Sequence, residues 1–174
     1  KEMNFYNFLK NCNQAGIKMI VVPLVDKSSI KNLNEENNTT AFFCNFQNFL
    51  KKYKMVIAFE SDFYPKKLIK FIEKFDPNFF GINYDIGNSA GLNFDYKMQM
   101  NSYHERIKNV HIKDKNTKGM NVKLGTGIAK FKKVFKALNK INYRGAFAFE
   151  TTRQNNPIQT MRYNIKFLKN GLNV

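Results

Sequence analysis

Four side chains that can bind a metal stand at the ends of four predicted strands. These are Glu60, Asp85, His111 and Glu150, which follow short apolar runs and lie 25, 26 and 39 residues apart. Because the carboxyl ends of parallel strands meet at one edge of a sheet, the four side chains can converge despite this spacing. Three carboxylates and an imidazole suit one divalent cation, such as Mn²⁺, Mg²⁺, Co²⁺ or Zn²⁺. The pattern therefore indicates a divalent-metal site.

Each of these residues also has a purely structural interpretation. Glu60 or Asp85 could cap the helix after its strand, because a carboxylate accepts hydrogen bonds from the free backbone N–H groups of a first turn. His111, between two aliphatic residues, could be a hydrogen-bonded core histidine. The metal interpretation is favoured because all four residues hold the same position relative to their strands.

Strands that alternate with helices are needed to position these side chains. Apolar runs predict strands at residues 17–25, 55–60, 79–85, 109–112 and 146–150. Helical spacing predicts helices at residues 3–15, 65–75, 96–107 and 131–138. A further helix is predicted along an apolar stripe from Phe42 to Leu50, with Thr39 or Thr40 as its cap. The last predicted helix starts at Pro157 with Asn156 as its N-cap, and its apolar face consists of Ile158, Met161, Ile165 and Leu168. Such an alternation indicates a parallel sheet covered by helices.

The predicted fold class is α/β, a partial (β/α)8 TIM barrel of about five C-terminal units with parallel strands. A complete barrel needs eight strands and about 250 residues, whereas this chain has 174. Glycine-rich loops of the nucleotide-binding type are missing from the sequence. We therefore expect residues 1–174 to form a single domain, the C-terminal part of a barrel whose N-terminal β/α units are missing.

The charge of the chain raises the question of nucleic-acid binding. Lys and Arg number 29 against 13 Asp and Glu, a net charge of +16, and basic surfaces bind phosphate backbones. However, 25 of the basic residues are Lys spread along the whole chain among Asn, Ile and Phe, all residues with A/T-rich codons. Genome composition accounts for this better than a binding patch, so nucleic acid is not the expected partner.

Several classes of protein are excluded by composition. A hydrophobic content of 43% is too high for a disordered chain. The sequence has no apolar run of the roughly 18 residues that a membrane span needs and no signal-peptide core near residue 1. Two cysteines do not make a disulfide framework. We expect a cytoplasmic protein with no membrane partner.

Several motifs together resemble the xylose isomerase-like TIM barrels. They are Ala58-Phe-Glu60, Asp85-Ile-Gly-Asn-Ser89, Val110-His-Ile-Lys-Asp114, Leu124-Gly-Thr-Gly127 and Tyr143-Arg-Gly145 followed by Phe149-Glu150. The resemblance covers about residues 17 to 170 and is closest to the sugar-phosphate isomerase/epimerase branch, such as L-xylulose/L-ribulose 5-phosphate 3-epimerases and hexulose-6-phosphate isomerases. The motifs identify the superfamily more specifically than they identify a substrate.

The resemblance implies an enzyme, a metal-dependent isomerase or epimerase of a ketose or sugar phosphate that acts through an enediolate. It assigns one divalent metal to Glu60, Asp85, His111 and Glu150, and it assigns the acid/base pair to Glu60 and Glu150. The chemistry agrees, because a metal bound to a ketose carbonyl and the adjacent hydroxyl acidifies the α C–H bond, and carboxylates can then remove and return the proton.

Three further residues are expected to contact the substrate, a small sugar or sugar phosphate. Asn88 stands where some ketose epimerases have a histidine, and its amide can bind a sugar hydroxyl but cannot transfer a proton. Lys113 and Arg153 follow the last two strands, at the usual phosphate end of such barrels, although either could lie in a solvated loop. The open edges of a partial barrel make association into a homo-oligomer an expected outcome.

Two alternative functions remain open at this point. The first is a dehydratase of the inosose type, which would use the same metal and base to expel a hydroxide. The second is an endonuclease IV-like DNA-repair or nucleic-acid-binding protein that exploits the +16 charge. The chain has only two histidines and so cannot supply a full set of ligands for the three zinc sites of endonuclease IV.

Overall fold

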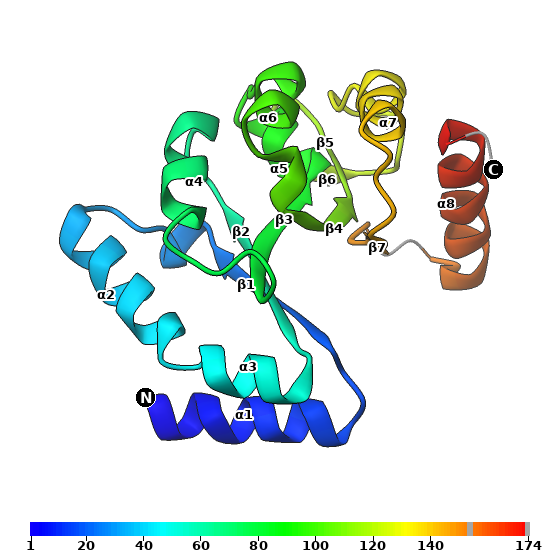
Figure 1. The fold of residues 1–174 in the computed structure, drawn as a ribbon. Coiled ribbons are helices and arrows are strands. Elements are labelled where there is room, and N and C mark those ends of the chain that lie inside the picture. Colours follow the sequence, from blue (N-terminus) through cyan, green and yellow to red (C-terminus); the bar gives the residue numbers. More distant parts are fainter. Residues whose placement is uncertain (153–154, 173–174) are drawn as a thin grey trace. The chain divides into compact units, whose positions relative to one another are not determined.

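The computed structural model describes residues 1–152 and 155–172. It divides the chain into two compact units, Lys1–Asn83 and Tyr84–Val174. In the described part of the chain, five strands of four to six residues alternate with helices (Figure 1), and those of the five that pair within one unit run parallel. This is the predicted α/β pattern of a partial (β/α) barrel.

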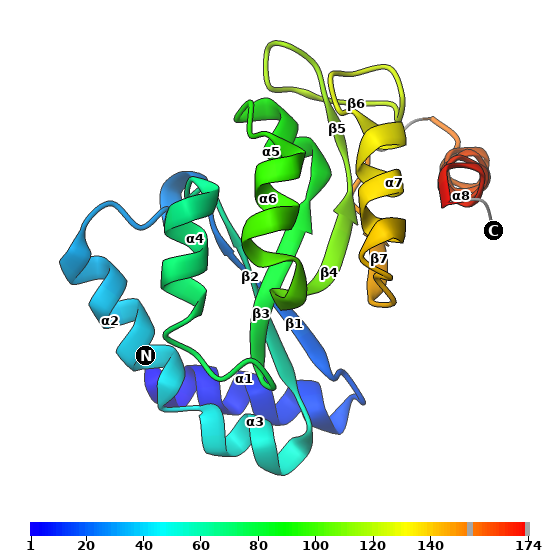
Figure 2. The same cartoon turned by 45° about the horizontal axis from the view of Figure 1, so that its top comes forward.

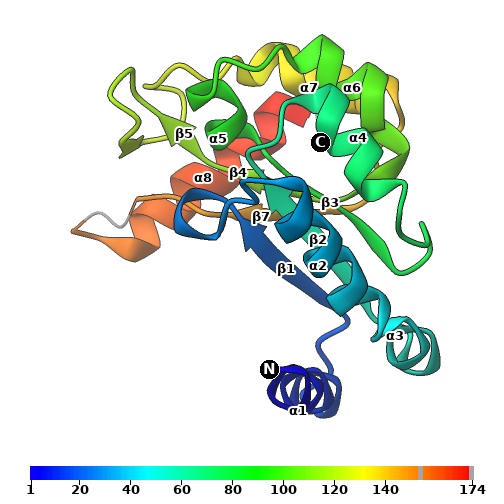
Figure 3. The same cartoon turned by 90° about the vertical axis from the view of Figure 1, so that its left-hand side faces the viewer.

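The first unit contains three strands and the helices that connect them. Its elements are α1 (Glu2–Gln14), β1 (Met19–Leu24), a 3-10 turn (Asp26–Ser28), α2 (Leu33–Cys44), α3 (Gln47–Tyr53), β2 (Val56–Ser61), α4 (Pro65–Ile72) and most of β3 (Phe80–Asp85). β2 lies between the other two strands: Met19 of β1 is opposite Val56, and Ile57 is opposite Phe80 of β3. Figure 3 shows β1 and β2 side by side along their length.

Phenylalanine rings form much of the core of the first unit. The ring of Phe59, which is fully buried on β2, lies 6.1 Å from and nearly parallel to that of Phe80 on β3. It also meets the rings of Phe43 from α2 and Phe71 from α4 edge to face. Burial of large aromatic rings is a major source of stability, so this cluster fixes α2 and α4 against β2, the strand that carries Glu60.

The helical region before β2 differs from the prediction. We expected a helix capped by Thr39 or Thr40, but α2 begins at Leu33, where the Asn32 side chain accepts a hydrogen bond from the backbone N–H of Glu35 at 2.9 Å. Asparagine is a strong N-cap, which explains the earlier start. Thr40 instead donates to a carbonyl one turn back within the helix.

The second unit begins within β3. Its further elements are α5 (Ile86–Gly91), α6 (Tyr96–Tyr103), a 3-10 turn (His104–Arg106), β4 (Ile107–Ile112), β5 (Asp114–Lys115), β6 (Asn121–Val122), α7 (Phe131–Lys140), β7 (Ala146–Phe149) and α8 (Pro157–Leu172). β4 and β7 pair in parallel, with His111 opposite Ala148. Figure 2 shows the small antiparallel hairpin β5–β6 beyond the end of β4. Neither this hairpin nor α5 was predicted.

The apolar stripe predicted for the last helix is not its buried face. Ile158, Met161 and Ile165 on α8 are 67%, 45% and 42% exposed. The inward positions are those of Asn164, which is buried and donates to Thr151, and Phe167, whose ring lies 5.0 Å from that of Phe131 on α7. Even with this exposed stripe, no helix within residues 1–152 and 155–172 is long and apolar enough to cross a membrane.

Candidate metal centre

Asp85 has both of the roles that the sequence left open. Its Oδ1 atom accepts a hydrogen bond of 2.7 Å from the backbone N–H of Asn88 and so caps α5. Its Oδ2 atom points the other way and lies 3.6 Å from Nδ1 of His111. The carboxylate is buried at the end of β3, and the cap fixes its orientation toward the imidazole.

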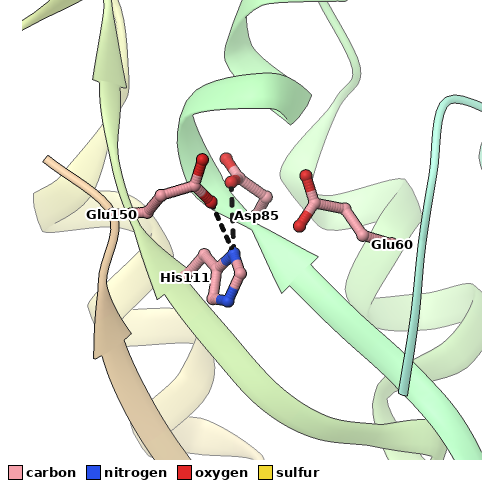
Figure 4. Close-up of side chains that lie close together, drawn as sticks. All are labelled: Glu60, Asp85, His111 and Glu150. Carbon is pink, nitrogen blue, oxygen red and sulfur yellow. Dashed lines mark ion pairs between the residues drawn. The ribbon is translucent and has the colours of Figure 1, made fainter. Parts of the chain in front are cut away.

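His111 and Glu150 come from the paired strands β4 and β7. The backbone N–H of Glu150, the residue after β7, donates to the carbonyl of Ile112 at 3.2 Å, which extends the pairing past the end of the strand. The Glu150 Oε2 atom then lies 2.9 Å from Nδ1 of His111 (Figure 4). The Glu150 side chain is 48% exposed and that of Asp85 is 2% exposed. Glu150 is therefore the carboxylate that a ligand from solvent can reach.

Asp85, His111 and Glu150 together fit a divalent cation. Each offers one ligand atom, and these atoms lie within 4.8 Å of one another. Carboxylate oxygen and imidazole nitrogen are ligands that Mn²⁺, Co²⁺ and Zn²⁺ all accept. The second unit therefore contains a possible metal-binding group made of three of the four residues predicted to be ligands.

Lys113 lies inside this group, not in a solvated loop. It is buried, with Nζ 3.0 Å from Oδ2 of Asp85 and 2.6 Å from Oε1 of Glu150. Burial by itself raises the pKa of the Asp85 carboxyl, but the nearby imidazole of His111 and the charge of Lys113 outweigh it and hold that pKa below its usual value. Burial likewise lowers the pKa of Lys113, but the two carboxylates outweigh it and raise that pKa. Both groups are therefore charged at neutral pH.

Glu60 lies in the first unit, at the position predicted from the sequence. It is the fifth residue of β2, opposite Pro23 of β1, and is buried. The Asn83 side chain donates to its Oε2 atom at 2.7 Å. The residue is thus a buried, hydrogen-bonded carboxylate near the carboxyl end of its strand.

Asn88 and Arg153 are the other two residues that were predicted to contact the substrate. Asn88 lies in the first turn of α5, where its backbone N–H is held by Asp85. Arg153 lies outside the described residues. The assignment of both to the substrate therefore stays a prediction.

Asp114 organises the loop beyond the metal-binding group. Its carboxylate is buried and accepts hydrogen bonds from the backbone N–H groups of Gly125, Gly127 and Ala129 at 2.9–3.1 Å. A Cβ atom at Gly127 would lie 2.3 Å from an oxygen of Asp114, so only glycine allows this approach. The sequence motif Leu124-Gly-Thr-Gly127 is therefore a turn built around a carboxylate.

Replacing Asp114 by asparagine is expected to destabilise the second unit by about 2–4 kcal/mol, because the amide NH₂ would face backbone donors that now bind a charged acceptor. Urea unfolding of the variant measures this. Asp95→Asn is the matched control, since exposed Asp95 accepts one backbone hydrogen bond, from Lys97. Equal losses in the two variants would contradict the role given to Asp114.

Comparisons with known proteins agree with this architecture. A family model described as "Xylose isomerase-like TIM barrel" matches residues 4–171. No curated protein matches the sequence. Among solved structures, a xylose isomerase domain protein from Planctomyces limnophilus aligns with a TM-score of 0.81 at 16% identity and covers 98% of this chain and 65% of its own.

Two other solved structures are similar to the same extent. An IOLI protein with a bound zinc atom aligns with a TM-score of 0.81 at 16% identity, over 98% of this chain and 68% of its own. A D-psicose 3-epimerase, solved in the presence of D-fructose, has a TM-score of 0.81 at 14% identity, over 98% of this chain and 70% of its own. The chain thus spans about two thirds of the length of these proteins. At these identities the likeness shows the fold.

Proposed function

Since the chain belongs to the xylose isomerase-like TIM barrel family, we propose that it is part of a divalent-metal-dependent isomerase or epimerase of a ketose or ketose phosphate. The observation that carries the proposal is the convergence of Asp85, His111 and Glu150 within metal-ligand reach, with Glu150 open to solvent. Solved relatives of this fold include proteins described as an L-ribulose 3-epimerase and a D-psicose 3-epimerase.

We further propose that Glu60 is the fourth ligand. Its carboxylate is held by the side chain of Asn83 on the neighbouring strand β3. The support for this role is the place of a buried carboxylate near the carboxyl end of β2, the position that was predicted for a metal ligand.

The metal, when bound, would polarise the carbonyl of a chelated ketose and so acidify the adjacent C–H bond. Glu150 is the proposed base: a carboxylate oxygen takes the proton from that carbon, and the electron pair moves into the enediolate of the substrate. Glu60, on the other side of the substrate, is the proposed acid: in its protonated form its carboxyl group gives a proton to the same carbon, the electron pair of the enediolate forms the new C–H bond, and the resulting carboxylate is protonated again from solvent. Removal and return on opposite faces invert the configuration, which is epimerisation.

The predicted substrate contacts are retained as proposals. The amide of Asn88, at the start of α5, would bind a sugar hydroxyl, and Arg153 would bind a phosphate or a distal hydroxyl. Lys113 is adjacent to Glu150, so its ammonium group would meet a substrate oxygen only at the reacting end. Contacts at the distal end of the substrate would therefore decide whether the site prefers a phosphorylated or an unphosphorylated sugar.

Hydrogen exchange at the reacting carbon tests the proposed function. The full-length protein is incubated in D₂O with Mn²⁺ and D-fructose, D-tagatose or L-xylulose 5-phosphate, and loss of the C3–H signal is followed by NMR. We expect exchange with at least one ketose, and we expect excess chelator to reduce it to the background rate because the acidifying cation is removed. Exchange that persists at the same rate with chelator would contradict a metal-dependent enzyme.

A further inference from the structure

We propose that Lys113 is a built-in counter-cation: its ammonium group takes the place of the divalent metal between Asp85 and Glu150 and must leave these carboxylates when the metal binds. The inference rests on the proposed function only in assuming that the site takes a metal. It makes Lys113 a positioning residue that holds the ligands ready and sets the metal affinity.

The position of the ammonium group is the first support. Nζ lies 3.0 Å from Oδ2 of Asp85 and 2.6 Å from Oε1 of Glu150, so one cation bridges two proposed ligands. The Asp85 oxygen that it contacts is the same atom that faces His111. A metal at this group would therefore need an oxygen that the ammonium group already holds.

The packing of the Lys113 side chain is the second support. A Cβ atom at Gly87 would lie 2.8 Å from Cγ of Lys113 and 2.9 Å from its carbonyl oxygen. Only glycine therefore allows the first turn of α5 to pass so close to the stem of Lys113. The side chain lies in a fitted space beside the helix that Asp85 caps, and so its ammonium group is directed into the ligand group.

The charges of these side chains indicate in which direction the loss of Lys113 would change the metal affinity. Two carboxylates that share a buried site repel each other unless a cation compensates them, and the ammonium group supplies one positive charge. A divalent metal supplies two positive charges to the same oxygens. An ammonium group and a divalent metal at the same carboxylate oxygens would also repel each other. Metal and ammonium therefore compete, and removing the ammonium should strengthen metal binding.

The test compares Lys113→Met with Lys115→Met in the full-length protein, using Mn²⁺ alone as the probe. Lys115 is two residues further along the chain, and its side chain forms no ion pair with any of the described residues, so it controls for loss of a lysine. We expect Lys113→Met to bind Mn²⁺ at least about tenfold more tightly than wild type in calorimetric titration. With chelator present, we expect it to unfold at a lower urea concentration than Lys115→Met, and we expect saturating Mn²⁺ to remove most of this difference.

One further variant, Lys113→Arg, and folding of Lys113→Met with Mn²⁺ present complete the test. Lys113→Arg keeps the positive charge and is expected to bind Mn²⁺ within about threefold of wild type. If Lys113→Met folds only when Mn²⁺ is present, the inference is supported, because the metal then replaces the ammonium group. Failure to fold even with saturating Mn²⁺, or Mn²⁺ affinity equal to or weaker than that of wild type, would overturn it.

The Mn²⁺-binding test of Lys113 and the hydrogen-exchange test of the proposed function can fail independently of each other. Tighter Mn²⁺ binding by Lys113→Met without any exchange in the wild-type protein would leave the counter-cation role intact and remove the proposed reaction. If the wild-type protein shows metal-dependent exchange but Lys113→Met binds Mn²⁺ no more tightly than wild type, the proposed reaction stands and the counter-cation role is wrong. If neither protein binds Mn²⁺, both the competition and the metal-dependent function are wrong.

Discussion

Replacing Glu150 by glutamine is expected to reduce hydrogen exchange at the reacting carbon by about 10²- to 10⁴-fold, the range that a general base contributes. Glutamine keeps an oxygen that can still ligate a metal but cannot accept the proton. The structure singles out Glu150 because its carboxylate is the exposed one in the group, with its backbone fixed by the carbonyl of Ile112. The NMR exchange assay at saturating Mn²⁺ measures the effect.

The matched control for this variant is Glu105→Gln. Glu105 is exposed in the 3-10 turn before β4, and its replacement should leave the exchange rate unchanged. A calorimetric Mn²⁺ titration of Glu150→Gln, run in parallel, shows that the metal is still bound when the rate is measured. Undiminished exchange in Glu150→Gln would remove this residue from the acid/base pair.

Replacing His111 by glutamine is expected to lower the affinity for Mn²⁺ by at least about 100-fold. Loss of a group that merely supports a metal ligand commonly costs 10- to 100-fold in affinity, so loss of a ligand should cost more. His111 is also the residue that faces both Asp85 and Glu150, at 3.6 Å and 2.9 Å. Its removal therefore takes away the imidazole ligand and one constraint on each carboxylate.

The chain provides a control of the same chemistry, because it contains one other histidine, His104. The Nδ1 atom of His104 lies 2.8 Å from the backbone carbonyl of Met100, in the turn between α6 and β4. His104→Gln should bind Mn²⁺ as wild type does. Equal affinities of the two variants would show that His111 is not a ligand.

The fold and part of the site could be predicted from the sequence for one reason. Strands in a parallel sheet are short, apolar and easily recognised, and the position of a residue at the end of its strand determines the edge at which it lies. Asp85, His111 and Glu150 were selected by this rule, and the second unit brings them together. The same rule placed Glu60, which stays a predicted ligand.

The role of Lys113 could not be predicted in this way. In a chain with 25 lysines, a lysine after a strand is most simply a solvated residue. What buries it is tertiary structure: the close approach of Gly87 and two carboxylates that are 28 and 37 residues away in sequence. One local signal existed, because Lys113 follows His111 by two residues, the spacing of side chains on the same face of a strand.

Local capping and close packing explain the helix that was missed, α5. The helix α5 has only six residues and contains two glycines, so its intrinsic helix propensity is low. It forms because Asp85 caps it and because Gly87 lets it pack against Lys113. Helix propensity alone could not reveal a helix whose stability comes from the site that it helps to build.

Anomalous diffraction from crystals of the full-length protein grown with Mn²⁺ tests the central claim most directly. We expect one manganese peak within about 2.0–2.6 Å of oxygens of Asp85 and Glu150 and a ring nitrogen of His111, with Glu60 as the fourth ligand and the Lys113 ammonium group withdrawn from its bridge. Manganese bound elsewhere, or no manganese peak and Lys113 still between the two carboxylates, would contradict the metal centre and the function built on it.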